Sequence, residues 1–182
     1  MPIVYKSCTP AEAAEHFCNT CDTGEKGRVR SLVLIALGTT IATPLTSEAW
    51  TALVEAGTVV IIPETSGTFD GGTPKMITGF GDVKEKKIGD DYVLTVKDPN
   101  YKENISFWEN TEKETWNIAF RSETQLMIVN APVTVTAKAP IEDDLETSIT
   151  WNIEAKWFSS SKPKATPFAP IADLFSCFEI TE

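Results

Sequence analysis

The sequence is poor in the residue types that most often carry catalysis or bind metals. Its 182 residues include one histidine, His16, and four cysteines at irregular positions. It has no Gly-x-Ser-x-Gly elbow, no His-Glu-x-x-His helix and no phosphate-binding glycine loop. Because only His16 offers an imidazole base, we expect a protein that is not an enzyme and that needs no cofactor.

Basic residues are outnumbered, and long apolar runs are absent. The chain carries 26 acidic and 16 basic residues, which gives a net charge of -10. This charge repels phosphate backbones and anionic membrane surfaces, so we expect no specific nucleic-acid binding and no membrane binding. The longest apolar run, residues 32–37, is far too short to span a bilayer, and the first residues lack the pattern of an export signal.

The cysteine-containing stretch "EHFCNTCDTGEKGR" is the one candidate metal site. A preceding capped helix, residues 10–17, would separate Cys8 from Cys18 by roughly 12–15 Å at about 1.5 Å per residue. A zinc set therefore has to combine His16, Cys18 and Cys21 with the distant Cys177. Since a single Cys-x-x-Cys is a weak signal, we expect ordinary thiols and no bound metal.

Most of the remaining sequence has the period of β-strands. In "SITWNIEAKWF", Trp151, Ile153 and Trp157 share one face while Thr150 and Lys156 share the other, which is typical of a half-buried antiparallel strand. The apolar run within residues 28–42 predicts one or two buried strands. Further strands are predicted at residues 58–63, 91–97, 115–120, 124–130 and 132–138.

One longer helix is predicted from "TSEAWTALVEAG". Ser47 is the expected N-cap and Gly57 the expected C-cap, with Trp50, Leu53 and Val54 on the face that packs on a sheet. The predicted fold is therefore mainly β (α+β): an antiparallel β-sandwich or barrel with one packed α-helix, a short N-terminal helix and a C-terminal arm.

The connections are predicted from turn-forming residues. Residues 63–75, "PETSGTFDGGTPK", suggest a flexible loop, and residues 88–92 a hairpin turn. The acidic segment at residues 141–146 lacks the ligand spacing of a calcium loop, so a solvated turn is expected there.

Composition divides the chain into an N-terminal arm with a short helix (1–27), a β-rich core domain (28–158) and a proline-rich C-terminal arm (159–182). The C-terminal arm carries apolar residues at helical spacing, which need a receiving surface on the protein's own body or on a neighbouring subunit. The residues expected to make assembly contacts are Phe168, Ile171, Leu174, Phe175 and Phe178.

In layout, the strand-rich body, the helix "SEAWTALVEAG" and the loop "PETSGTFDGGTPK" resemble the tail-tube and related β-sandwich virion proteins of tailed bacteriophages. The resemblance covers most of residues 28–158. It implies a structural virion subunit, made in the host bacterial cytoplasm, that stacks as rings with copies of itself and other virion proteins. The negative charge would then keep DNA passing through the lumen from adhering.

Three other functions fit the same composition. A capsid-associated virion protein would share the β-rich layout. A carbohydrate-binding or adhesion β-sandwich needs tryptophans exposed on one face, and a small zinc-stabilised domain needs bound metal.

Overall fold

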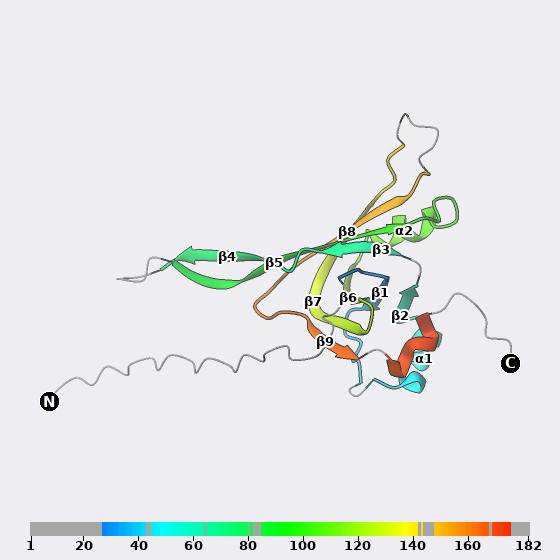
Figure 1. Cartoon of the computed structure of the whole chain (residues 1–182), viewed down its shortest axis with the longest axis horizontal. Coiled ribbons are helices and arrows are strands. Elements are labelled where there is room, and N and C mark those ends of the chain that lie inside the picture. The colour runs from blue at the N-terminus through cyan, green and yellow to red at the C-terminus, as the bar shows by residue number, and fades with distance from the viewer. Residues whose placement is uncertain are drawn as a thin grey trace.

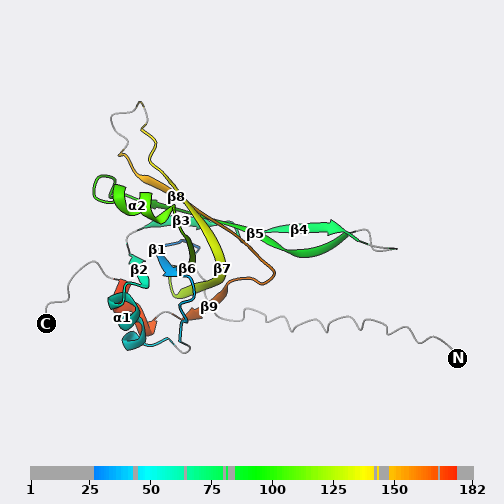
Figure 2. The same ribbon diagram turned by 180° about the vertical axis from the view of Figure 1, so that it is seen from behind.

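The computed structural model describes residues 27–42, 45–63, 65–79, 81, 85–141, 143, 148–167 and 169–175. In this part of the chain, one antiparallel nine-stranded sheet is accompanied by three short helices (Figures 1 and 2). The predicted class, a mainly β antiparallel fold with a packed helix, is thereby confirmed, whereas the short helix expected at residues 10–17 lies outside the described residues. The elements are β1 (Ser31–Ala36), α1 (Ser47–Glu55), β2 (Val59–Ile62), β3 (Ser66–Phe69), β4 (Thr73–Thr78), β5 (Glu85–Asp98), α2 (Ile105–Thr111), β6 (Thr115–Arg121), β7 (Gln125–Lys138), β8 (Trp151–Ser159), β9 (Lys164–Pro167) and the 3-10 helix η1 (Ala169–Phe175).

The sheet curls into a barrel-like body. Its strand order is β2-β1-β6-β7-β8-β5-β3. In addition, β4 pairs with the first half of β5, and β9 pairs with the first residues of β7. Val29, just before β1, closes the path by pairing with Gly67 of β3 through backbone hydrogen bonds of 3.2 and 3.0 Å. We call this pairing the seam. Since the seam joins β3 to the chain just before β1, it closes the sheet around an interior that side chains must fill, and β2 remains an edge strand.

Large apolar side chains fill that interior. Phe69, Tyr92 and Trp157 stack on one another with ring centroids 5.3–5.9 Å apart, and Phe120 packs against Phe69 at 4.9 Å. The buried residues of this core are Val29, Leu32, Leu34, Tyr92, Leu94, Val96, Trp108, Ile118, Phe120, Val129, Val133, Val135, Trp151, Ile153, Ala155 and Trp157. The barrel is thus a packed core and not a channel.

Strand β1 is buried on both faces. Leu32 and Leu34 point into the barrel, whereas Val33 and Ile35 point outward into a second apolar cluster. Helices α1 and η1 cover this outer face and contact each other (Figure 1). Double burial explains why the sequence of β1 is continuously apolar instead of alternating.

Helix α1 lies where the sequence predicts it, with three differences in detail. Its N-cap is Thr46, whose hydroxyl accepts from the Ala49 N–H at 3.4 Å, so the expected cap at Ser47 is wrong by one position. Its C-cap is Ala56, and Gly57 follows with a φ of +70°. Trp50 is fully buried, but Val54 is 38% exposed and does not belong to the packed face.

The expected loop at residues 63–75 is wrong, because it contains β3 and the start of β4. Both strands run antiparallel to β5, and only Asp70, Gly71 and Gly72 interrupt them. Gly71 and Gly72 have positive φ, and the Asp70 carboxylate accepts from the Gly72 N–H at 3.0 Å.

The expected turn at residues 88–92 is also wrong, because these residues lie inside β5. Gly89 serves close packing there: a Cβ on it would meet the Phe158 ring at 2.6 Å. The chain reverses instead between Thr78 and Glu85, the ends of the paired strands β4 and β5.

The C-terminal arm folds back on the body. Strand β9 pairs with β7, and in η1 the side chains of Ile171 and Phe175 are buried in the second cluster. The receiving surface is therefore the protein's own body, one of the two alternatives that the sequence left open. The predicted strand alternation is confirmed from Trp151 to Trp157, since Trp151, Ile153 and Trp157 are buried, but Ile149 lies before β8 and is half-buried.

The seam generates the first prediction. A Cβ at Gly67 would lie 2.6 Å from a methyl carbon of Val96 and would also clash with the Thr95 carbonyl oxygen. We expect Gly67→Ala to lower the free energy of unfolding by about 1–3 kcal/mol through overpacking, measured by urea denaturation. Gly27→Ala is the matched control, because a Cβ there meets nothing within 4 Å. Equal losses in the two variants would show that close packing at the seam is not important.

Candidate functional site

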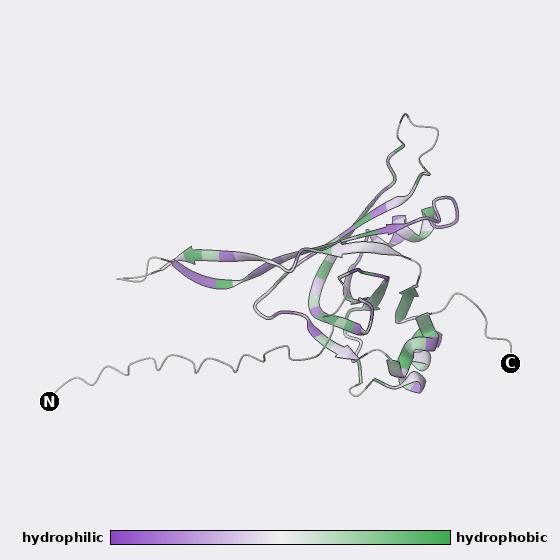
Figure 3. Ribbon diagram, in the orientation of Figure 1, coloured by the Kyte–Doolittle hydropathy of each residue, from purple (hydrophilic) through white to green (hydrophobic). Residues whose placement is uncertain are grey.

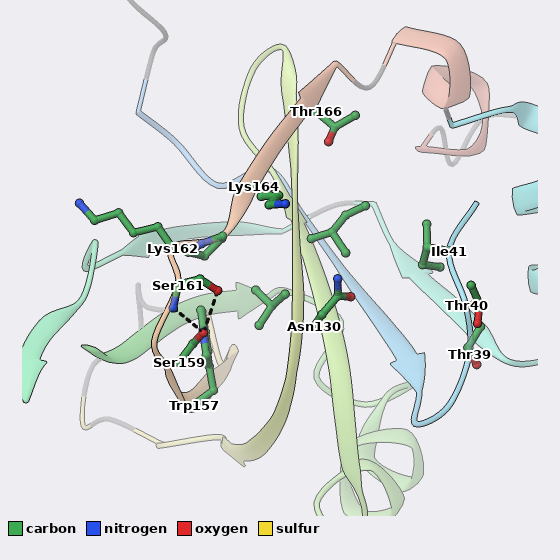
Figure 4. Close-up of a pocket in the computed structure, with 13 residues that line it drawn as sticks. Thr39, Thr40, Ile41, Asn130, Trp157, Ser159, Ser161, Lys162, Lys164 and Thr166 are labelled. Carbon is green, nitrogen blue, oxygen red and sulfur yellow. Dashed lines mark hydrogen bonds between the residues drawn. The ribbon is translucent and has the colours of Figure 1, made fainter. Parts of the chain in front are cut away.

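A pocket of about 510 Å³ opens beside β7, between the stretch that pairs with β8 and the stretch that pairs with β9. One edge of β7 is shared: β8 pairs with Thr134–Lys138, and β9 pairs with Gln125–Ile128. The pocket lies in the gap between these two pairings, beside Val129 and Asn130 (Figure 4). The turn between β8 and β9 forms another wall, where the Ser159 hydroxyl accepts from the Ser161 N–H at 3.1 Å.

The lining of this pocket suits binding better than catalysis. Its polar side chains are hydroxyls, one amide and the ammonium groups of Lys162 and Lys164, with Trp157 at the back. No carboxylate, imidazole or thiol is among the described residues that line it. Among the described lining residues, no carboxylate or imidazole therefore lies beside these hydroxyl and ammonium groups to activate them.

A buried carboxylate lies at a different place, at the end of β5. Asp98 is 1% exposed and accepts hydrogen bonds from Trp108 Nε1 at 2.9 Å, Asn104 Nδ2 at 2.7 Å and the Asn100 backbone N–H at 2.9 Å. With three donors the carboxylate is well satisfied. Its role is therefore structural: it ties α2 and the preceding turn to the sheet.

Strand β2 offers an unpaired backbone edge. It pairs with β1 and with no other described strand. Hollows lie on both sides of it, one of about 270 Å³ next to Phe107 and one of about 400 Å³ next to Val54 and Leu174. Figure 3 shows β2 as strongly hydrophobic. An apolar edge of this kind is a typical place for another strand to add.

The β4–β5 hairpin, residues 73–91, projects far from the body (Figures 1 and 2). All six residues of β4 are exposed, and at about 3.3 Å per residue this strand alone reaches about 20 Å. Met76 and Ile77 are 47% and 45% exposed, and Ile88 is 37% exposed. A two-stranded ribbon with exposed apolar side chains is at best marginally stable in water alone.

At the root of this hairpin, β5 pairs with β8 of the body, and contacts within β5 surround Asp90. Lys87 pairs at 2.7 Å with Asp90, a residue only 5% exposed, and the Tyr92 hydroxyl donates to Asp90 at 3.4 Å. Burial, and then the negative charge of Asp90, raise the pKa of Tyr92, so that the hydroxyl stays protonated and keeps donating.

The site residues expected from sequence are only partly within the structure. Three of the residues expected at assembly contacts are described: Ile171 and Phe175 are buried against α1 and β1, and Leu174 is half-buried. The zinc candidates His16, Cys18, Cys21 and Cys177, and also Phe168 and Phe178, lie outside the described residues. Within the described part, no group of three or more His, Cys, Asp or Glu side chains is placed to hold a metal.

The tryptophans do not form an exposed platform. Trp50, Trp108, Trp151 and Trp157 are buried, and Trp116 is half-buried. Flat sugar-stacking faces need exposed rings, so the burial of these side chains does not favour a carbohydrate-binding function.

No protein family, no curated protein and no solved structure matches this sequence or its fold. Among the described helices, none combines the length and the apolar character needed to cross a bilayer. The described part of the chain offers open strand edges and a projecting ribbon.

Asp98 gives the second prediction. Asp98→Ala removes the acceptor of three donors, among them the buried Trp108 Nε1–H, so we expect a loss of about 3 kcal/mol in the free energy of unfolding, together with weaker hydrogen-exchange protection of α2. Asp91→Ala, which removes an exposed carboxylate 3.6 Å from Lys75, should cost less than about 1 kcal/mol. An unchanged exchange pattern in α2 after Asp98→Ala would contradict the structural role.

Proposed function

We propose that this protein is a non-enzymatic structural subunit that assembles with copies of itself. The observation that carries the proposal is the distribution of exposed apolar side chains. The described residues include seven large hydrophobic side chains that are exposed, and Met76, Ile77, Ile88 and Phe158 of these gather on the β4–β5 hairpin or at its root. Exposed apolar residues concentrated on one projection are typical of an interaction surface.

Open backbone edges support the same function. Among the described strands, β2 pairs only with β1, and β4 pairs only with β5, so one edge of each strand has no strand partner. Such edges promote uncontrolled strand addition unless a neighbour covers them. A hairpin of one copy that reaches a different surface of the next copy makes a heterologous contact, and repeated heterologous contacts give rings or filaments.

More specifically, we propose that the protein is a subunit of a tailed-bacteriophage virion. It would lie in the tail, the tail tube or the head-tail region, alongside other virion proteins. This proposal is supported by the layout of a β-barrel body, an outer helix and a long projecting hairpin, together with the net charge of -10. Since the barrel interior is packed, any lumen for DNA has to form between copies. A lining of acidic subunits would then repel the DNA backbone.

The test is self-association of the purified full chain, measured by sedimentation velocity and by electron microscopy. We expect oligomers that appear as rings or tubes. Ile77→Glu places a charge on the hairpin and should raise the concentration needed for half-assembly at least tenfold, because a buried charge without a partner weakens a contact strongly.

Ile141→Glu is the matched control, because it makes the same change at a side chain that is 73% exposed and distant in sequence from the hairpin. It should assemble like the unmodified protein. A chain that stays monomeric at high concentration would overturn the proposal, whereas assembly that Ile77→Glu does not weaken would remove the hairpin from the contact.

A further inference from the structure

All three arginines of the chain, Arg28, Arg30 and Arg121, line one pocket. Its volume is about 240 Å³, and its other described lining residues are Pro63, Thr65 and Phe175. None of these lining residues is acidic, although acidic residues outnumber basic ones in the chain. Three guanidinium groups on one small surface are unexpected in so acidic a protein.

The seam explains how distant arginines come together. Val29 points into the barrel core, so the side chains of Arg28 and Arg30 on either side of it point away from the core. Arg121 ends β6, and its carbonyl accepts from the Arg30 N–H at 2.8 Å. The pairing of the chain before β1 with β6 and β3 therefore gathers all three side chains outside the barrel wall.

The positive charge of Arg30 is only partly neutralised. The Glu123 carboxylate lies 2.7 Å from Nε of Arg30, but both side chains are about two-fifths exposed, so water and salt screen the pair. Arg121 lies over the Phe175 ring at 5.8 Å. Burial, and then the charge of Arg30, lower the pKa of Arg121, whereas the Glu123 carboxylate raises it.

The same pocket contains the buried hydroxyl of Thr65. Thr65 lines the same pocket and is 7% exposed, and its Oγ1 has no hydrogen-bond partner among the described residues. Most buried hydroxyls in proteins are paired, because an unpaired one loses its interactions with water. An acceptor placed in the pocket would satisfy this donor.

We infer that the arginine pocket at the seam binds a small oxyanion, a carboxylate or a phosphate group, through its guanidinium groups and the Thr65 hydroxyl. The planar fork of arginine donors matches the oxygens of both groups. The anion has two sources: a free anion in solution, or an acidic side chain presented by another copy of this chain. Binding of a free anion does not depend on the assembly proposed above.

The test compares the full chain with two variants of equal net charge. Arg28 is exposed, so Arg28→Gln removes one guanidinium without disturbing the core. Lys102→Gln removes an exposed charge elsewhere. The measured quantity is the midpoint of thermal unfolding. Inorganic phosphate replaces chloride in the millimolar range, and acetate replaces it in a parallel series. The ionic strength is held constant, so that general screening and exclusion effects are the same in every sample.

We expect phosphate or acetate to raise the unfolding midpoint of the unmodified chain and of Lys102→Gln alike. Arg28→Gln should need about tenfold more of the anion for the same rise, since one charge-assisted hydrogen bond is lost. Thr65→Val should also weaken binding, with no loss of stability in chloride alone, because its hydroxyl has no partner to lose. Equal responses to both anions and chloride, or equal anion responses in all variants, would overturn the inference.

Sedimentation velocity in chloride and in phosphate distinguishes the two sources. If an acidic side chain of another copy occupies the pocket, phosphate competes with it and shifts assemblies toward smaller species, as Arg28→Gln does in chloride. If the ligand is a free anion, phosphate leaves the sedimentation profile unchanged while it still raises the unfolding midpoint. Since the unfolding response is also measurable on a monomer, failure of assembly and failure of this site are separate outcomes.

Discussion

The fold depends on the closure of its sheet at Val29 and Gly67. Two backbone hydrogen bonds there convert an open, twisted sheet into a barrel with a single interior. Gly67 has no side chain, and this lets β3 lie close against the backbone of β5 at the position that also pairs with Val29. It also sets which side chains point outward at the joint, and so the core and the arginine pocket have one geometric origin.

The two apolar clusters are joined by β1. Its alternate residues belong to different clusters, the barrel interior and the layer beneath α1 and η1. Because β1 packs in both clusters, a shift of this strand that weakens the packing on one face also weakens the packing on the other. In the same arrangement, α1 packs on the outer face of β1 and contributes Trp50 to the second cluster.

The sequence predicts those parts of the fold whose cause is local. Alternation at Trp151, Ile153 and Trp157 gives the correct strand and the correct buried face, since the period of a strand depends only on neighbouring residues. Residues 63–75 mislead, because their glycines and threonines suggest a loop although their pairing with β5 makes them strands. Gly89 misleads for a related reason: it permits close approach of Phe158 instead of a turn.

Helix α2 and the candidate binding sites were missed because their causes are not local. Asn104 caps α2 without a side-chain hydrogen bond, so the usual start signal is absent, and the helix is held by Asp98 from the sheet. The arginine cluster combines positions near 30 with one near 120. Only the register of β1 against β6 brings these together, and no spacing rule within either segment reveals it.

The late position of η1 in the chain has a consequence for biosynthesis. β1, α1 and β2 leave the ribosome well before Ile171 and Phe175, the residues that complete the layer over Val33 and Ile35. During that interval the outer face of β1 remains uncovered on a nascent chain, in a form that attracts chaperones or other nascent chains. The layer over Val33 and Ile35 is therefore completed only after η1 has been translated.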